Sequence, residues 1–219
     1  FRAEFDRITP EKRDLYWRGV VMEQFDGQTW SARKSGIMHP ASRNAEHDRL
    51  HYRIYLEPTQ QRILFALAPL LSWGGIDAIQ SANGSFHSRE NIVAQSMYWV
   101  ESGRDPLQVQ PFGEVPASLE KNTLLPPLVA PRTRETANKL YRSAGKDVEK
   151  FVQSIRQFIF DNEFSYTLSP PKLSGDTVDD FLFRTRAGYC SHYASAAAVM
   201  LRSVGIPARV IGGYQGGEY

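Results

Sequence analysis

Apolar and polar residues alternate with a period of two through the first half of the chain. The clearest alternation places an apolar side chain at every second position, at Leu50, Tyr52, Ile54 and Leu56. This pattern is typical of a strand that buries one face. Shorter apolar runs predict further strands at 16–25, 28–32, 63–68, 76–80, from 86 onward and at 95–101.

Two dipeptides predict hairpin turns between these strands. Asp26-Gly27 and Asn83-Gly84 consist of residues that tolerate the positive φ angles of a two-residue turn. The first lies between 16–25 and 28–32, and the second lies between 76–80 and the strand from 86. About six to eight short strands with such turns indicate a β-sandwich-like domain, which we expect to span residues 1–115.

The second half changes to a helical period. A proline-rich stretch, 116–130, is expected to be a linker. Pro131 suits the first turn of a helix that Gly145 ends. Asp147 is expected to cap a second helix, and Thr177 with Asp180 forms a capping-box pattern before a short third one. The second helix has one apolar face, made by Val148, Phe151, Val152, Ile155, Phe158 and Ile159.

A further helix is expected from about 191 to 204. Gly205 suits the left-handed position after it, Ile206 suits the apolar contact that accompanies this ending, and Pro207 prevents continuation. Residues 208–213 are then predicted to form a strand. Small and apolar residues share one face of the helix, namely Ala194, Ala197, Ala198, Leu201 and Val204.

Cys190 stands at the start of that helix, where the physical environment suits a nucleophile. A helix N-terminus carries partial positive charge, which favours the thiolate over the thiol. Its free backbone N–H groups can stabilise a developing oxyanion. Gly188 is expected to leave room for a substrate beside the sulfur. The alternative interpretation is an inert cysteine in the core.

Composition argues against several function classes. Cys190 is the only cysteine, so no disulfide can form within the chain. The net charge of +2 is too small, and the lysines and arginines are too dispersed, to argue for nucleic acid binding. No Cys/His group has metal-ligand spacing, so we expect no metal and no cofactor.

Two other segments lack a recognisable signal. The glycines at 212–217 have no Lys-Ser/Thr as in a phosphate loop, and we interpret them as a mobile loop near the cleft. The apolar stretch 63–73 is interrupted by Pro69 and is shorter than the roughly 20 residues of a spanning helix. We therefore expect this chain to be soluble and to associate with a membrane only through segments outside it.

Several motifs around Cys190 are specific. They are Phe181-Leu182-Phe183, Gly188-Tyr189-Cys190-Ser191-His192-Tyr193-Ala194-Ser195-Ala196, Met200-Leu201-Arg202, Gly205-Ile206-Pro207-Ala208-Arg209-Val210 and Gly213-Tyr214. These motifs resemble the transglutaminase-like superfamily, most closely bacterial inner-membrane proteins in which such a domain faces the periplasm. The resemblance covers about residues 176–219, although many relatives have glutamate where Ser191 stands. Tyr16-Trp17-Arg18-Gly19 and Phe25-Asp26-Gly27 with Trp30 are similar to the same group.

The resemblance implies an α+β fold and a reaction. The fold is the β-sandwich-like N-terminal domain followed, at 131–219, by the helical half of a papain-like transglutaminase core. The family uses a Cys-His-Asp triad. Its thiolate attacks a glutamine side-chain carboxamide, ammonia leaves, and an amine or water resolves the thioester. Cys190 corresponds to the nucleophile. The implied partners are a protein or peptide substrate with a glutamine and an amine acceptor, with cell-wall peptides or envelope proteins as candidates, at the periplasmic face of the bacterial inner membrane.

The family's His and Asp follow the cysteine, so we expect both beyond residue 219. No histidine follows His192, and a residue two positions from Cys190 projects about 200° away around a helix. We therefore expect His192 to make a packing or polar contact beside the site, and the chain alone to be inactive. The histidines of the β-rich half are expected on its surface, at His39, His47, His51 and His87.

Other residues are candidates for roles around the thiol. Tyr166, Gly188 and Tyr189 are candidates to line the cleft or an oxyanion site, and Tyr166 packed in the core is the alternative. Arg186, and also Arg184, are candidates for electrostatic support, with solvated side chains as the alternative. We expect Arg209 to pair with a buried carboxylate. The tryptophans are expected in the sandwich core, at Trp17, Trp30, Trp73 and Trp99.

Two other functions stay open at this point. A cysteine peptidase or amidase would use the same thioester with water as the acceptor. A non-catalytic binding or scaffolding module of the cell envelope would use the β-rich domain to bind a partner and would not need a reactive thiol.

Overall fold

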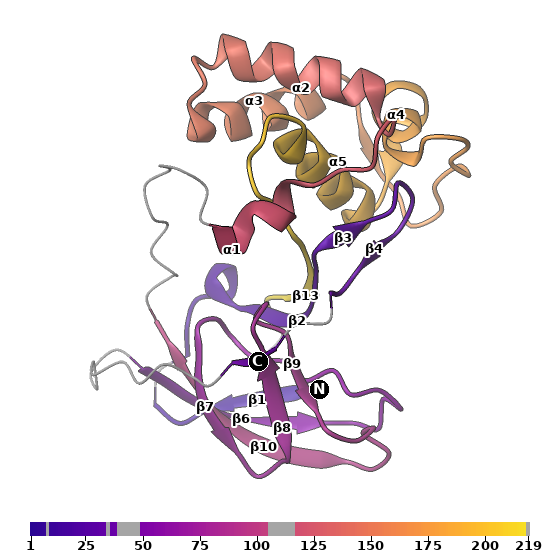
Figure 1. The fold of residues 1–219 in the computed structure, drawn as a ribbon. Helices are drawn as coiled ribbons and strands as arrows, with labels where there is room; N and C mark the ends of the chain where they lie inside the picture. Colours follow the sequence, from indigo (N-terminus) through magenta and orange to yellow (C-terminus); the bar gives the residue numbers. More distant parts are fainter. Residues whose placement is uncertain (8, 34–35, 39–48, 105–116, 218–219) are drawn as a thin grey trace. The chain divides into compact units, whose positions relative to one another are not determined.

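The computed structural model of the chain describes residues 1–7, 9–33, 36–38, 49–104 and 117–217. The chain divides into two compact units, each assembled from separate stretches of sequence (Figure 1). The first comprises Phe1–Val21, Lys34–Gln110 and Ile211–Tyr219, and the second comprises Met22–Arg33 and Pro111–Val210.

The first unit is built from strands. An antiparallel sheet has the order β1-β6-β10-β7, a second has the order β5-β8-β9, and β2 pairs with β13. A 3₁₀ turn at Lys12–Asp14 precedes β2. The strands are β1 (Arg2–Phe5), β2 (Tyr16–Met22), β5 (Ile37–Met38), β6 (Arg49–Leu56), β7 (Leu70–Gly74), β8 (Ala78–Ser81), β9 (Phe86–Ser88), β10 (Ser96–Gly103) and β13 (Val210–Gln215).

The predicted alternation in 49–56 is confirmed, because the four apolar residues of β6 are buried in the core of this unit. Tyr52 lies opposite Val100 and Ile54 lies opposite Tyr98 of β10. The hairpin across Asn83-Gly84 is also confirmed: β8 and β9 pair antiparallel, and Gly84 has a φ angle of 90°. Both features depend on neighbours in sequence, which is why the sequence pattern predicts them.

The predicted strand at 63–68 is wrong. Its backbone makes only isolated bridges, from Ile63 to His87 and from Ala66 to Arg18. Tyrosine hydroxyls from β6 and β10 accept hydrogen bonds from backbone N–H groups that would otherwise pair with a neighbouring strand. The hydroxyl of Tyr98 accepts from Phe65 N at 3.0 Å, and that of Tyr52 accepts from Leu67 N at 2.8 Å. The strand forms a few residues later, as β7.

The tryptophan prediction is correct in part. Trp17 is buried in the core of the first unit and Trp73 packs against it. Trp99 is instead 46% exposed, because it points outward from β10 and lies over Gly74 of β7, where a Cβ atom would come within 2.5 Å of its ring. Trp30 belongs to the second unit.

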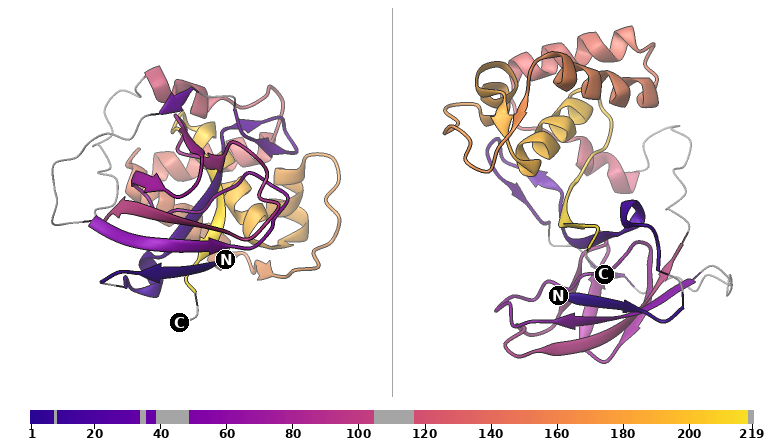
Figure 2. Two further views of the ribbon diagram at one scale, coloured as in Figure 1. Left: turned by 90° about the horizontal axis from the view of Figure 1, so that it is seen from below. Right: turned by 180° about the vertical axis from the view of Figure 1, so that it is seen from behind.

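The second unit is mainly helical. Its central helix, α5, runs between α2 and the β3–β4 hairpin in Figure 1 and in the right-hand view of Figure 2. A 3₁₀ turn at Lys121–Thr123 and a π turn at Phe181–Thr185 complete it. The elements are β3 (Gln24–Phe25), β4 (Trp30–Ser31), α1 (Ala117–Glu120), α2 (Pro131–Ser143), α3 (Val148–Asp161), β11 (Ser165–Tyr166), α4 (Thr177–Asp180), β12 (Ala187–Gly188) and α5 (Cys190–Ser203).

Most predicted helix boundaries are confirmed. Pro131 begins α2, and the carboxylate of Asp147 caps α3 by accepting from Lys150 N at 2.9 Å. The predicted cap of α4 is wrong, because the capping residue is Asp176 and Thr177 is already helical. The Asp176 carboxylate accepts from the N–H groups of Val178 and Asp179, which explains why this residue and not Thr177 caps the helix.

The end of α5 follows the prediction closely. Gly205 has a φ angle of 81° and donates to Arg202 O, while Ile206 N donates to Leu201 O at 3.0 Å. These two bonds form a Schellman motif, and the buried Ile206 side chain supplies its apolar contact. The predicted buried face is wrong in part: Ala194 is exposed, and the most buried residues include Ala196, Val199 and Met200. Neighbours surround most of the helix, so residues outside one stripe are also buried.

The two units interleave along the chain, which differs from the linear division at 1–115, 116–130 and 131–219. The β3–β4 hairpin joins the second unit because Phe25 is buried in its core. The expected linker contains α1 and the turn at Lys121–Thr123. The sequence predicts compact segments by composition, whereas the units are set by contacts between distant stretches.

The glycines near the C-terminal end do not form the expected loop. Gly212 and Gly213 lie within β13, beside β2. A Cβ atom on Gly213 would lie 2.1 Å from the carbonyl oxygen of Trp17, so only glycine permits this approach of the two strands. Gly216 has a φ angle of 75°, and its carbonyl accepts from the indole nitrogen of Trp17 at 3.1 Å.

Candidate active site

Cys190 is the first residue of α5, and it is exposed. Tyr189, with φ −114° and ψ −177°, is the extended capping residue before it. The helix therefore begins one residue earlier than expected. The first N–H groups of a helix have no carbonyl partner within the helix, and they carry its positive end. The thiol thus lies beside free N–H groups that could bind an oxyanion.

His192 folds back onto the start of the same helix. Its ring Nδ1 accepts from Tyr189 N at 3.3 Å, and its backbone N–H donates to Tyr189 O at 2.9 Å. Its ring meets the Tyr189 ring edge-on, with centroids 4.5 Å apart. His192 therefore makes the polar contact beside the site that the sequence predicts, and it fixes the residue before Cys190.

Gly188 is buried, and its lack of a side chain has a different explanation from the expected one. A Cβ atom there would lie 2.8 Å from Cγ of His192 and 2.9 Å from Cε2 of Phe181. These distances are well inside van der Waals contact. The glycine thus lets His192 and Phe181 pack against the segment that leads to Cys190.

Tyr166 is 65% exposed, so it is not the core residue of the alternative interpretation. It lies on β11, which pairs parallel with β12 and places Tyr166 opposite Gly188. Thr167 N extends this pairing by donating to Gly188 O at 2.9 Å. The ring of Tyr166 stacks on Tyr193, with centroids 6.3 Å apart and planes inclined by 17°. Burial raises the pKa of Tyr193, and the neighbouring Tyr166 adds to this effect.

The two arginines before the cysteine have partners of their own. Arg186 adopts a left-handed conformation, with a φ angle of 49°, and its guanidinium donates to Asn162 O at 3.3 Å. Arg184 forms an ion pair with Asp180 and donates to Lys172 O. The Arg184 guanidinium lowers the pKa of Asp180 to about 2. Electrostatic support of the thiol by Arg186 stays a prediction.

Two aspartates attach the start of α2 to the segment before the cysteine. Asp179 accepts from Arg132 N at 3.0 Å, and from both the N–H and the hydroxyl of Thr133. Asp176 accepts from Ala130 N and also caps α4. The helix that precedes the π turn is therefore anchored to α2 by charged hydrogen bonds.

Sequence reasoning overlooked the role of Arg202. Its side chain is 4% exposed, and it donates to Ala208 O at 2.9 Å, Leu124 O at 2.9 Å and Glu23 O at 2.8 Å. The pKa of Arg202 is lowered to about 10 by burial. Its signal in the sequence is the motif Met200-Leu201-Arg202, which places a cation among apolar residues. Arg209, for which we expect a carboxylate partner, is half-buried, and that pairing stays a prediction.

Trp30 is a second residue whose placement the sequence does not predict. Its indole N–H donates to the hydroxyl of Ser195 at 2.9 Å, and its ring stacks on Phe25 with centroids 4.9 Å apart. The β3–β4 hairpin is thereby fixed to the first half of α5, the helix that begins with Cys190.

The predicted surface histidines lie in the first unit or outside the described residues. His51 faces Glu101 with 3.5 Å between Nε2 and Oε1, and His87 bonds the hydroxyl of Ser81 at 3.0 Å. Burial and the charge of Arg62 lower the pKa of the half-buried His87. His39 and His47 are outside the described residues.

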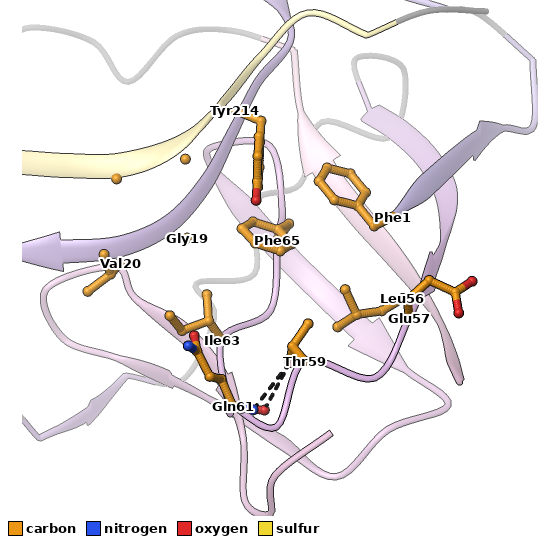
Figure 3. A pocket seen from close by; sticks show the side chains of 12 residues that line it. Phe1, Gly19, Val20, Leu56, Glu57, Thr59, Gln61, Ile63, Phe65 and Tyr214 are labelled. Carbon is orange, nitrogen blue, oxygen red and sulfur yellow. Dashed lines mark hydrogen bonds between the residues drawn. The ribbon is translucent and has the colours of Figure 1, made fainter. Parts of the chain in front are cut away.

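The first unit encloses a cavity of about 560 Å³ (Figure 3). The rings of Phe1, Phe65 and Tyr214 gather on one side of it, and Phe1 stacks on Phe65 with centroids 4.8 Å apart. Thr59 and Gln61, hydrogen-bonded to each other, lie on another side. Among the described residues that line the cavity, none is a cysteine or histidine.

The described residues contain neither a candidate metal site nor a candidate membrane-spanning helix. In that part of the chain, no three His, Cys, Asp or Glu side chains are arranged to hold a metal ion. No helix within the described ranges has the length and apolar character needed to cross a bilayer.

Comparison with protein families gives two matches. The model described as the TgpA N-terminal domain matches residues 1–108, and the transglutaminase-like superfamily matches residues 134–219. The second match includes Cys190 and the motifs around it.

Two curated proteins are similar to this chain. A protein-glutamine gamma-glutamyltransferase of Pseudomonas aeruginosa is 37% identical over 222 residues, covering all of this chain and 32% of that protein. The uncharacterized protein YebA of Bacillus subtilis is 41% identical over 98 residues, covering 43% of this chain and 13% of that protein. The chain thus spans about a third of the first relative and a smaller part of the second.

Two solved structures have the same fold. The crystal structure of the periplasmic domain of TgpA from Pseudomonas aeruginosa has a TM-score of 0.84 and 34% identity, covering 99% of this chain and 74% of that one. The same domain bound to ethylmercury has a TM-score of 0.82 and 35% identity, covering 99% and 76%. These matches confirm the mixed α+β fold with a transglutaminase-like core. The chain therefore belongs to the transglutaminase-like superfamily and is related to proteins of the TgpA type.

Proposed function

We propose that Cys190 is the nucleophile of an acyl transfer from a protein or peptide glutamine to an amine. The observation that carries the proposal is the exposed thiol at the first position of α5, within the segment matched to the transglutaminase-like superfamily. The relative named as a protein-glutamine gamma-glutamyltransferase supports this choice of reaction.

The reaction proceeds in two steps. The Cys190 sulfur attacks the carboxamide carbon of glutamine, the thiol proton passes to the leaving nitrogen, and the tetrahedral oxyanion collapses with loss of ammonia to give a thioester. The amine then attacks the thioester carbon, an amide forms and the thiol returns. The N–H groups at the start of α5 are suited to stabilise the oxyanion.

The remaining triad members belong to a longer polypeptide in this proposal. The family's base and its orienting carboxylate follow the cysteine, whereas His192 is occupied with Tyr189 N through its Nδ1. The chain alone is therefore inactive in transfer, although its thiol is accessible. Amine incorporation by the isolated 219-residue chain that is lost in Cys190→Ala would contradict this part.

We also place the activity in the periplasm, on proteins or peptides that carry a glutamine. The similarity to a periplasmic domain of TgpA supports the location. Envelope proteins and the peptides of the cell wall are the candidate substrates, because they are the polypeptides present in that compartment.

The test uses the longer polypeptide that contains this chain. It is incubated with a glutamine-rich acyl-donor protein and a fluorescent primary amine, and both incorporated amine and released ammonia are measured. Wild type is expected to incorporate the amine, and Cys190→Ala is expected to lose this activity. Release of ammonia without incorporation would instead indicate an amidase. Cellular function preserved in Cys190→Ala would indicate a binding module.

A further inference from the structure

A pair of tyrosines, Tyr166 exposed and Tyr193 half-buried, lies near the proposed nucleophile. Tyr193 is three residues after Cys190 on α5, so both side chains lie on the same side of the helix. Tyr166 reaches this place from β11, because the parallel pairing with β12 puts it opposite Gly188, two residues before Cys190. The Tyr166–Tyr193 pair therefore lies beside the segment that carries Cys190, with one ring from each of two elements.

Core residues pack against Tyr193, whereas Tyr166 stays exposed to solvent. Tyr193 packs against Phe181 with centroids 5.1 Å apart and against Phe164 at 6.2 Å. Tyr166 stacks on it, and the pairing of β11 with β12 fixes its backbone. Tyr166 nevertheless remains 65% exposed, and Leu168, two residues further along, is 79% exposed. A fixed aromatic ring with an open face provides contact area at little entropic cost.

Tyr166 differs in its exposure from the aromatic residues around it. Phe181 is buried in the core of the unit, and Phe164 and Tyr193 are half-buried against that core. Exposed apolar groups gathered at one place are typical of binding surfaces. Any acyl donor that reaches the exposed sulfur of Cys190 has its neighbouring residues within reach of this surface.

We propose that the Tyr166–Tyr193 pair selects acyl donors that carry an apolar or aromatic side chain next to the reactive glutamine. This inference rests on the proposed function and specifies the class of acyl donor that the proposed reaction uses. The side chain beside the glutamine packs on the open face of Tyr166, which positions the carboxamide at the thiol. Tyr166 acts through its ring and is a specificity residue.

The test is alkylation of Cys190 in the 219-residue chain, which requires neither the base nor the amine acceptor. Two short peptides carry a chloromethyl ketone in place of the glutamine carboxamide, one with phenylalanine beside it and one with glycine. The sulfur forms a bond to the methylene carbon, chloride leaves, and the thiol proton passes to the buffer. Mass spectrometry of the intact chain gives the second-order rate constants.

Wild type is expected to react about three- to tenfold faster with the phenylalanine peptide, a gain typical of one ring contact. Tyr166→Ala is expected to bring this ratio close to one, and Tyr166→Phe is expected to retain it. Phe160→Ala, which removes a ring 82% exposed on α3, serves as the matched control and should leave the ratio unchanged. Iodoacetamide has no side chain that could contact Tyr166, so it should alkylate Cys190 at the same rate in wild type and in each variant.

Several results would overturn the proposal. These are equal rates for both peptides in wild type, a ratio that survives in Tyr166→Ala, or no alkylation by either peptide. A ratio lost in Tyr166→Phe would assign the effect to the hydroxyl group. Tyr166→Thr suits a strand and replaces the alanine variant if that one unfolds. Failure of amine incorporation in the longer polypeptide, with the alkylation ratio intact, would contradict only the proposed function.

Discussion

The guanidinium carbon of Arg202 lies 4.7 Å from the centre of the Trp30 ring. This contact joins the β3–β4 hairpin to the C-terminal half of α5, and the hydrogen bond from Trp30 to Ser195 joins it to the first half. Arg202 also donates to carbonyls of three separate segments, at Glu23, Leu124 and Ala208. One buried cation thus joins the elements that surround α5.

Replacing Arg202 with methionine is expected to destabilise the protein by about 3 kcal/mol or more, because buried carbonyls would lose their donors. Urea unfolding of the purified chain measures the change. Arg156→Met, at an exposed position of α3, is the matched control and should stay within about 0.5 kcal/mol of wild type. Equal stability of the two variants would show that the carbonyls find other partners.

Gly188→Ala is expected to cost about 1–3 kcal/mol, because the new methyl group overlaps His192 and Phe181. Gly217→Ala is the control, since a Cβ atom there meets nothing within 4 Å. Thermal or urea unfolding compares the two. If Gly188→Ala proves as stable as the control, the packing of His192 against this residue is not required.

His192→Asn is expected to keep amine incorporation by the longer polypeptide within about tenfold of wild type. The asparagine carbonyl can still accept from Tyr189 N, and loss of a general base typically costs a hundredfold or more. Initial rates of incorporation are the measurement, with Cys190→Ala as the inactive reference. A loss of a hundredfold or greater would identify His192 as the base.

Asp180 contributes a pH-dependent part of the stability. Its pKa is held at about 2 by Arg184, below the ordinary value of 3.8, so the folded state binds this proton more weakly than the unfolded state does. The contribution is therefore complete above about pH 4 and is lost as the pH falls through about 2.

Asp180→Asn should accordingly be less stable than wild type at neutral pH and approach it near pH 2. The measurement is the free energy of unfolding as a function of pH. Arg184→Met removes the same ion pair and should give a similar difference. A wild-type curve parallel to that of Asp180→Asn between pH 4 and 2 would contradict this assignment.

The sequence predicts features that depend on residues close together in the chain. The alternation in β6, the cap of α3 by Asp147 and the Schellman ending at Gly205 all follow from patterns within a few residues. The placement of Cys190 at the start of α5 belongs to the same class, because a helix start has local signals. The interactions behind these patterns form between residues close together in the chain, so they can be predicted without knowledge of the fold.

The tertiary structure decides where distant segments meet. It alone brings Tyr166 opposite Gly188, exposes that tyrosine, and gives the Arg202 guanidinium its carbonyl partners. It also replaces the expected strand at 63–68 with a segment bound by tyrosine hydroxyls from β6 and β10. Such contacts join residues far apart in the chain, and a local pattern does not encode their partners. The sequence therefore determines the place of Cys190 and its helix, whereas the fold determines the surface near that residue.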